Sequence, residues 1–216
     1  MNIPRYSLYV IPDELHSAYE FADIIKMVLE GGANMIQLRD RTRSLDEWLM
    51  HGGRYIRSIA ADYSVPFIVN DRVDLAMLLK ADGVHLGQED LPVAEVRKLM
   101  GEEAIIGVSC GTVQEALEAE LCGASYIGFG HMYPTSSKKK STPQRTLEEL
   151  REVSSAVKIP VIAIGGITVD KVAELLQAGA AGVAVIGAIC RSEDPQAMTM
   201  EFRKAIDSAL SRLLER

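Results

Sequence analysis

Acidic and amide side chains of the kind that hold a metal ion follow two apolar runs of the sequence. Asn70-Asp71 ends the first run, and Asp90 closes the segment His85-Leu86-Gly87-Gln88-Glu89-Asp90 after the second. Two carboxylates without a cluster of His or Cys suit a hard, oxygen-preferring cation such as Mg²⁺, which usually completes its shell with water and substrate phosphates. The pair therefore predicts a metal-assisted diphosphate site. Taken singly, each Asp would be a helix cap or a solvated loop residue.

A basic residue completes this predicted anion site. The run 34–39 ends in Gln37-Leu38-Arg39, and the alternation of side chains along a strand puts Gln37 and Arg39 on the same side. An arginine on the inner side of a sheet needs an anion or a carboxylate partner. We interpret Arg39 as a phosphate ligand. The alternative is an internal pair between Arg39 and an Asp.

Hydroxyl groups, lysines and glycines follow the later runs. Ser109 ends one run, where it caps the next helix or contacts a polar ring, and the long segment His131–Lys140 contains Thr135, Ser137 and Lys138. We expect this segment to form a lid over phosphates, with Lys139 and Lys140 in solvent. The glycines of Gly165-Gly166 and Gly187 allow backbone N–H groups to approach a second anion closely.

These residues need a scaffold that collects them at one edge. The predicted strands cover 7–11, 34–39, 67–70, 83–86, 105–109, 126–129, 161–164 and 182–186, and the predicted helices cover 17–30, 45–61, 71–80, 92–100, 112–121, 146–157, 168–178 and 194–214. Most strands are apolar on both faces, which is typical of a parallel sheet covered by helices. Eight βα units predict one (β/α)₈ TIM-barrel domain over 1–216, whose active site lies at the carboxyl ends of the strands. An open doubly wound sheet is the less favoured alternative, since no G-x-G-x-x-G follows the first strand.

The composition limits the partners. The chain has 216 residues, 48% of them hydrophobic, and a formal charge of −7, which disfavours nucleic-acid binding. It has no apolar run long enough for a membrane span and no apolar signal core. We expect the three cysteines to be buried, reduced thiols of a cytoplasmic protein. A homo-oligomer is compatible with the sequence.

Several of these segments together resemble the thiamine phosphate synthase family. They are Gln37-Leu38-Arg39, Asn70-Asp71-Arg72-Val73-Asp74, the stretch from Asp82 to Asp90, Gly107-Val108-Ser109, Pro134-Thr135 with Ser137-Lys138, and Ile164-Gly165-Gly166-Ile167. The resemblance implies a Mg²⁺-dependent transferase of thiamine synthesis. It joins a hydroxymethylpyrimidine diphosphate to a thiazole phosphate, and pyrophosphate leaves first to give a pyrimidine-methyl cation.

The resemblance also implies a role for each matching residue. Asp71 and Asp90 would hold Mg²⁺, and Arg39, Asn70 and Lys138 would bind the diphosphate. Gln37 and Ser109 would contact the pyrimidine. The thiazole phosphate would lie among the five remaining residues, Thr135, Ser137, Gly166, Ile186 and Gly187. The chain departs from the family at Arg41, usually Lys, and at Gly187, often Ser.

His131 leaves a second interpretation open. Phe129-Gly130-His131 and Arg41 also resemble the thiazole tautomerases, in which a His in this segment moves a proton on the thiazole precursor. The comparable tautomerases lack the paired Asp residues, so Asp71 and Asp90 favour the synthase. A regulatory barrel that has lost turnover is the third alternative.

Overall fold

Eight parallel strands form a closed barrel in the computed structural model, which describes residues 3–4, 6–12, 20–39, 43–135 and 143–214. The strands are Ser7–Val10 (β1), Met35–Leu38 (β2), Phe67–Asn70 (β3), Gly83–Leu86 (β4), Ile105–Cys110 (β5), Tyr126–Gly130 (β6), Val161–Ile164 (β7) and Gly182–Val185 (β8). They pair in sequence order, and β8 closes the barrel by pairing with β1, with Ser7 opposite Gly182. The predicted fold class is confirmed.

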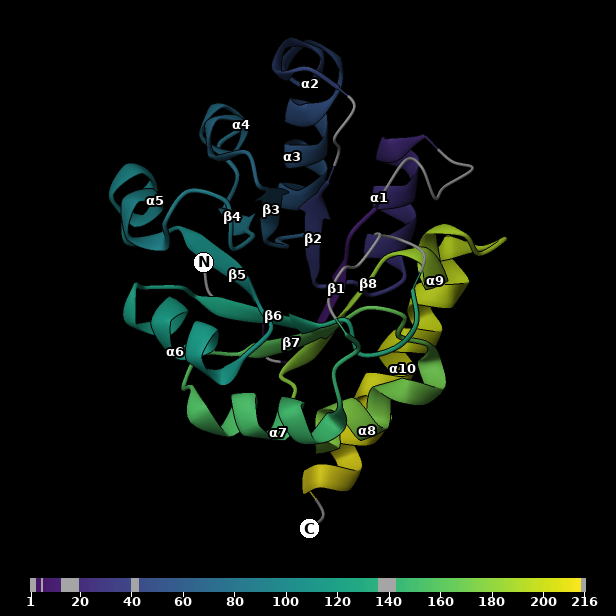
Figure 1. Ribbon diagram of the computed structural model, residues 1–216. Helices are drawn as coiled ribbons and strands as arrows, with labels where there is room; N and C mark the ends of the chain where they lie inside the picture. Colours follow the sequence, from purple (N-terminus) through teal and green to yellow (C-terminus); the bar gives the residue numbers. More distant parts are fainter. Residues whose placement is uncertain (1–2, 5, 13–19, 40–42, 136–142, 215–216) are drawn as a thin grey trace.

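Helices surround the barrel on its outside (Figure 1). They are Phe21–Glu30 (α1), Leu45–His51 (α2), Gly53–Asp62 (α3), Val73–Leu78 (α4), Val93–Met100 (α5), Val113–Leu121 (α6), Leu147–Ala156 (α7), Val172–Gln177 (α8), Gly187–Cys190 (α9) and Pro195–Leu214 (α10), with a 3₁₀ turn, Val169–Lys171, before α8. None of the helices among the described residues is long and apolar enough to cross a membrane.

The strands divide the apolar residues into two clusters. Alternate side chains, such as Leu8 and Val10, pack outward against the helices and form the larger core. The residues between them point into the barrel and form a separate buried cluster, which includes Tyr9, Met35 and Tyr126. This division explains why the strands read as continuous apolar runs, because both faces are buried.

Two inward positions of the barrel are glycines, and large polar rings from other strands occupy the space beside them. Gly107 on β5 has no side chain because the ring of Tyr126 occupies that space, and a Cβ atom there would overlap the ring. A Cβ atom on Gly128 would lie 3.0 Å from Cε1 of His85. These glycines leave room for two large polar rings within the barrel.

The predicted elements correspond to the observed ones except at three places. The helix expected over 45–61 is two helices, α2 and α3, because Gly52 adopts φ 153° between them. The four-residue helix α9 was not predicted. Residues 13–19, which include the expected start of the first helix, lie outside the described residues. The expected helix starts at Thr112 and Asp194 are confirmed, since each side chain accepts a hydrogen bond from a backbone N–H three residues on.

The three cysteines are free thiols. Cys110 and Cys190 are buried as expected, but the expectation was wrong for Cys122, which is exposed at the end of α6. Burial raises the pKa of the Cys110 thiol to about 12, with a smaller contribution from the negative charge of Glu115. Cys110 is therefore a packed, protonated side chain at neutral pH.

Candidate active site

Two adjoining cavities open at the carboxyl ends of the strands. The inner cavity, of about 100 Å³, lies within the mouth of the barrel, and the outer cavity, of about 310 Å³, lies over β7 and β8. They have five lining residues in common: Thr135, Ile164, Gly165, Ala184 and Ile186. The two cavities therefore share a wall.

Polar residues expected from the sequence come together in the inner cavity. Gln37 on β2, Arg39 after it, Asn70 at the end of β3 and Ser109 on β5 all line it. Gln37 is only 2% exposed, as the alternation of side chains along its strand predicts. The cavity thus presents a cation, two amides and a hydroxyl to one small volume.

A continuous chain of hydrogen bonds runs across the floor of this cavity. Gln37 Nε2 donates to Tyr9 Oη at 2.7 Å, and Tyr9 Oη lies 3.0 Å from Tyr126 Oη. Tyr126 Oη lies 2.9 Å from His85 Nδ1, and His85 Nε2 lies 2.9 Å from Ser109 Oγ. The two residues expected to contact a ring, Gln37 and Ser109, are therefore connected through three other side chains.

Tyr9, His85 and Tyr126 are cavity residues that were not predicted from the sequence. All three line the inner cavity. The alternation of side chains along the strands could have indicated them, because each of the three residues falls at an inward position and carries a polar group. Burial raises the pKa of both phenols well above its ordinary value, so both keep their protons at neutral pH.

A glycine loop and the start of α9 line part of the outer cavity, together with Arg191. Gly165 and Gly166 follow β7 with φ of 101° and 65°, and Gly187 begins α9 after β8. The first hydrogen bond within α9 runs from Ile189 N to Ile186 O at 3.2 Å. The backbone N–H groups of Gly187 and of the residue after it precede that bond, so helix geometry gives them no partner inside α9. A helix N-terminus beside a glycine loop is a favourable place for an anion.

The two carboxylates lie on neighbouring rim loops. Asp71 follows β3 with φ 60°, and its backbone N–H donates to His85 O at 2.8 Å. Asp90 Oδ2 accepts from the Gly87 backbone N–H at 2.6 Å. Both residues are half-buried, and neither is among the residues that line the two cavities.

Within the described residues, no group of three or more His, Cys, Asp or Glu side chains is arranged to hold a metal ion. Asp71 and Asp90 fit a cation that needs only two protein carboxylates and takes its other ligands from water and phosphate. That is the usual behaviour of Mg²⁺.

The segment after β6 is fixed to the loop after β7. Met132 N donates to Ile164 O and Tyr133 N donates to Gly165 O, both at 3.0 Å. Tyr133 Oη donates to Glu174 Oε1 on α8 at 2.6 Å. These contacts bring Thr135 into the lining of both cavities.

His131 is not among the residues that line the two cavities, although residues shortly after it do line them. Its backbone oxygen accepts from Arg145 N at 2.8 Å. Arg41, Ser137 and Lys138, all candidate site residues from the sequence, lie outside the described residues.

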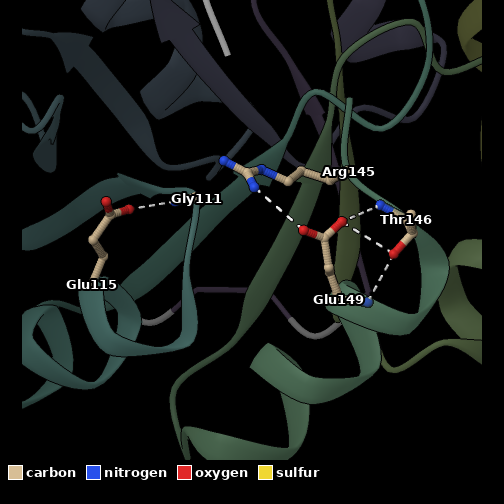
Figure 2. Close-up of polar contacts among 5 residues, drawn as sticks. All are labelled: Gly111, Glu115, Arg145, Thr146 and Glu149. Atoms are coloured by element: carbon tan, nitrogen blue, oxygen red, sulfur yellow. Dashed lines mark hydrogen bonds and ion pairs between the residues drawn. The ribbon is translucent and has the colours of Figure 1, made fainter. Parts of the chain in front are cut away.

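Arg145, just before α7, lies between Gly111 and Glu149, as Figure 2 shows. Its Nη1 pairs with Glu149 Oε1 at 3.3 Å, and a Cβ atom on Gly111 would lie 2.6 Å from its Nη2. Glu149 also accepts from Thr146 N at 2.7 Å and so closes the capping box of α7. The Thr146 N–H, the Thr146 hydroxyl and the Arg145 cation hold the pKa of the Glu149 carboxyl below its usual value. Figure 2 also shows that Gly111 N donates to Glu115, at 2.6 Å, which ties Gly111 to α6.

Comparison with known proteins places the chain in one family. Residues 8–189 match the family model described as thiamine monophosphate synthase. The thiamine-phosphate synthases of Shouchella clausii and Moorella thermoacetica are 42% and 43% identical to it, over 94% and 96% of this chain and 98% and 99% of their own lengths.

Solved structures agree with this placement. The thiamine phosphate pyrophosphorylase from Pyrococcus furiosus is 39% identical, with a TM-score of 0.86, and the match covers 94% of this chain and 96% of that one. A 3-hexulose-6-phosphate synthase, at 18% identity and a TM-score of 0.67, shares the fold alone. The chain belongs to the thiamine monophosphate synthase family.

Proposed function

We propose that this protein is a thiamine-phosphate synthase, which joins a hydroxymethylpyrimidine diphosphate to a thiazole phosphate and releases pyrophosphate. The observation that carries the proposal is the pair of adjoining cavities of different character in a chain of this family. The inner one presents several polar side chains among apolar ones, and the outer one presents a glycine loop, the start of α9 and Arg191. A reaction between two phosphorylated ligands needs two such neighbouring anion sites.

The inner cavity suits the pyrimidine diphosphate. Gln37 and Ser109 would hydrogen-bond the ring at opposite ends of the cavity floor. Arg39 and Asn70, on the same lining, would bind the diphosphate. Lys138 and Arg41 would add cationic groups to it, as the family resemblance implies.

The outer cavity suits the thiazole phosphate. The glycine loop at Gly166 and the N-terminus of α9 at Gly187 would donate backbone N–H groups to its phosphate. Thr135 lines both cavities and would position the ring between them, with Ile186 as an apolar wall. Ser137 would supply a further hydroxyl group. A glycine at position 187 is compatible with this role because the contact uses the backbone.

Mg²⁺ is the metal that these residues fit best. Asp71 and Asp90 would hold it, and the leaving diphosphate would supply part of its coordination shell. When bound, it would neutralise negative charge on the diphosphate as the C–O bond breaks. The hydrogen bond from Asp71 N to His85 O and that from Gly87 N to Asp90 Oδ2 fix the loops that carry the two carboxylates.

The chemistry then needs positioning more than proton transfer. The bond between the pyrimidine methylene carbon and the diphosphate oxygen breaks, and its electron pair leaves with the diphosphate. The lone pair of the thiazole nitrogen forms the new C–N bond to the pyrimidine-methyl cation. Arg39 and Lys138 would stabilise the leaving group, and the shared wall of the cavities would hold the two rings in contact.

The experiment compares three proteins with both phosphorylated precursors, with and without Mg²⁺. We expect the unmodified chain and His131→Ala to form thiamine phosphate with Mg²⁺, and Asp71→Ala to lose orders of magnitude in rate. No thiamine phosphate from the unmodified chain would contradict the proposal. Proton exchange on the thiazole precursor alone, lost in His131→Ala, would indicate a tautomerase instead, and binding without any reaction would indicate a regulatory barrel.

We also propose a cytoplasmic location. A reducing compartment suits a chain in which all three cysteines are free thiols.

A further inference from the structure

We propose that a clamp of five side chains at the edge of the outer cavity holds the segment after β6 in place and thereby sets the affinity of that cavity for its ligand. The clamp consists of Tyr133, Thr168, Asp170, Lys171 and Glu174. Tyr133, Lys171 and Glu174 are not among the residues that line either cavity, and they act as positioning residues. The inference rests on the proposed function for the identity of the ligand, the thiazole phosphate.

A continuous series of polar contacts runs through the clamp. Thr168 Oγ1 donates to Asp170 Oδ1 at 2.6 Å, and Asp170 Oδ2 lies 3.7 Å from Lys171 Nζ. Lys171 Nζ lies 3.4 Å from Glu174 Oε1, the same oxygen that accepts from Tyr133 Oη at 2.6 Å. Lys171 Nζ also lies 5.5 Å from the centre of the Tyr133 ring. The lysine is therefore placed between two carboxylates and beside the aromatic ring.

The two ends of the clamp belong to two different walls of the outer cavity. Thr168 lines the cavity itself, on the side that follows β7. Tyr133, at the other end, immediately precedes Pro134 and Thr135, which line the cavity on the side that follows β6. The clamp therefore connects these two walls through side chains.

The backbone ladder between the two loops ends just before the cavity wall. Met132 N and Tyr133 N donate to the backbone oxygens of Ile164 and Gly165, both at 3.0 Å, and tie the segment to the end of β7. Pro134 has no N–H group, so this ladder cannot continue through its nitrogen. The hydrogen bond from the Tyr133 hydroxyl to α8 anchors the chain at the point where the ladder ends.

The segment and the loop after β7 are in direct backbone contact. A Cβ atom on Gly166 would overlap the carbonyl oxygen of Pro134 and lie 2.7 Å from that of Tyr133, and one on Gly165 would lie 2.5 Å from Cβ of His131. Close-packed contacts of this kind transmit a displacement rather than absorb it. A shift of Tyr133 would therefore reach the glycine loop that forms the anion site.

The hydrogen bond between Tyr133 and Glu174 is of the strong type. A distance of 2.6 Å is typical of a hydroxyl that donates to an ionised carboxylate. Both residues are half-buried, so water and salt screen the contact less than they would at an exposed site. Burial, this hydrogen bond and the negative charges of Glu174 and Asp170 raise the pKa of the Tyr133 phenol above its usual value, so the phenol keeps the proton that it donates.

The first test measures kinetics in variants that break the clamp. Tyr133→Phe keeps the ring and removes the donor, and Glu174→Ala removes the acceptor. We expect either change to raise the KM for the thiazole phosphate about fivefold, within the range by which residues without ligand contact modulate coupling. The kcat and the KM for the pyrimidine diphosphate should change less than about twofold, because Pro134 lines the outer cavity only. Glu174→Gln still offers an oxygen to the phenol and should lose much less affinity than Glu174→Ala.

A double variant and a matched control show whether the two residues act through each other. Tyr133→Phe combined with Glu174→Ala should raise the KM about fivefold, as each change does alone, rather than about 25-fold, the product of two independent effects. Tyr63→Phe is the control, because Tyr63 Oη also donates to a glutamate, Glu30 Oε1, at 3.4 Å. That bond joins the ends of α3 and α1, which lead into the amino ends of β3 and β2, so its loss should leave all kinetic constants unchanged.

Hydrogen exchange tests the clamp without any substrate. The backbone N–H groups of Met132 and Tyr133 should exchange several-fold faster in Tyr133→Phe and in Glu174→Ala than in the unmodified protein. The N–H group of Ile127 within β6, which donates to Pro160 O at 2.9 Å, should exchange at its original rate and serves as the internal reference.

Any of three results would overturn the inference. The first is unchanged exchange at Met132 and Tyr133 in both single variants. The second is faster exchange with a KM for the thiazole phosphate no higher than that of Tyr63→Phe, and the third is a multiplicative rise of KM in the double variant. Absence of thiamine phosphate from the unmodified protein would contradict the proposed function instead, and the exchange rates would still report on the clamp.

Discussion

Gly166 carries the sharpest prediction for the outer cavity. Its φ of 65° lies in the left-handed region, where a residue with a Cβ atom costs about 1–2 kcal/mol. A Cβ atom there would also overlap the carbonyl oxygen of Pro134 and lie 2.7 Å from that of Tyr133. Real Cβ atoms essentially never lie within 3.0 Å of such an atom, so the Tyr133 oxygen alone must move by at least 3.0 − 2.7 = 0.3 Å. Overpacking of this kind typically adds about 1–3 kcal/mol.

Much of this cost should appear in binding at the outer cavity, because Gly166 and the displaced Pro134 line that cavity and not the inner one. We expect Gly166→Ala to raise the KM for the thiazole phosphate about tenfold, equivalent to about 1.4 kcal/mol. The KM for the pyrimidine diphosphate should change much less, since Gly166 does not line the inner cavity. Steady-state kinetics with each substrate varied in turn gives both values.

Gly123→Ala is the matched control. Gly123 has φ 91°, but its nearest neighbour to a new Cβ atom is Arg97 Nε at an ordinary 3.7 Å, and it lies before β6 at the opposite end of the barrel. It should lower the free energy of unfolding by about 1–2 kcal/mol through backbone strain alone. It should leave both KM values unchanged. Equal KM values for Gly166→Ala and the unmodified protein, or an equal increase for both glycine variants, would refute the steric reasoning.

Two further predictions concern other parts of the barrel. Cys122 is exposed, whereas burial raises the pKa of Cys110 to about 12. Iodoacetamide at pH 8 should therefore modify Cys122 in the folded protein and reach Cys110 only after unfolding. Equal rates of modification of the two cysteines, followed by mass spectrometry, would contradict this. Arg97 donates to the backbone oxygens of Gly101, Glu102, Ala104 and Gly123 at the amino ends of the strands. Arg97→Met should therefore lower the free energy of unfolding by about 2 kcal/mol, as measured by chemical denaturation. It should leave kcat unchanged in a parallel rate assay, because that face of the barrel contributes stability rather than catalysis.

The arrangement of strands could be predicted because it depends on local patterns. Both faces of each strand are apolar, and the turns before alternate strands contain small residues. Small residues in such turns favour the left-handed conformation, which is present at Gly32, Gly123 and Gly179. At the turn 81–83 the residue with positive φ is Lys80 instead, at 51°. Composition therefore predicts the position of a turn better than it predicts which residue of the turn has a positive φ.

The parts of the site that could not be predicted depend on contacts distant in sequence. Gln37, Arg39, Asn70 and Ser109 could be expected at one cavity because each lies at or near the carboxyl end of a strand. Tyr9 and Tyr126 were missed because their hydroxyls meet across 117 residues of sequence, and nothing local shows that two inward tyrosines share one layer. The exposure of Cys122 was missed for a similar reason, since the end of α6 faces away from the core.

His131 shows how a motif and its geometry can point differently. The segment Phe129-Gly130-His131 resembles that of the tautomerases, yet the His131 residue lines neither cavity. Thr135, four residues on, lines both. The hydrogen bonds that tie Met132 and Tyr133 to the loop after β7 turn the chain, so that the later residue reaches the site.

The central claim is that the two cavities hold the two halves of one coupling reaction. The most direct measurement is the yield of thiamine phosphate and of pyrophosphate when the protein is incubated with Mg²⁺ and both precursors, sampled over time. We predict equal amounts of the two products, and no thiamine phosphate when either precursor is omitted. Pyrophosphate release without thiamine phosphate in the complete mixture, or no reaction at all, would contradict the account.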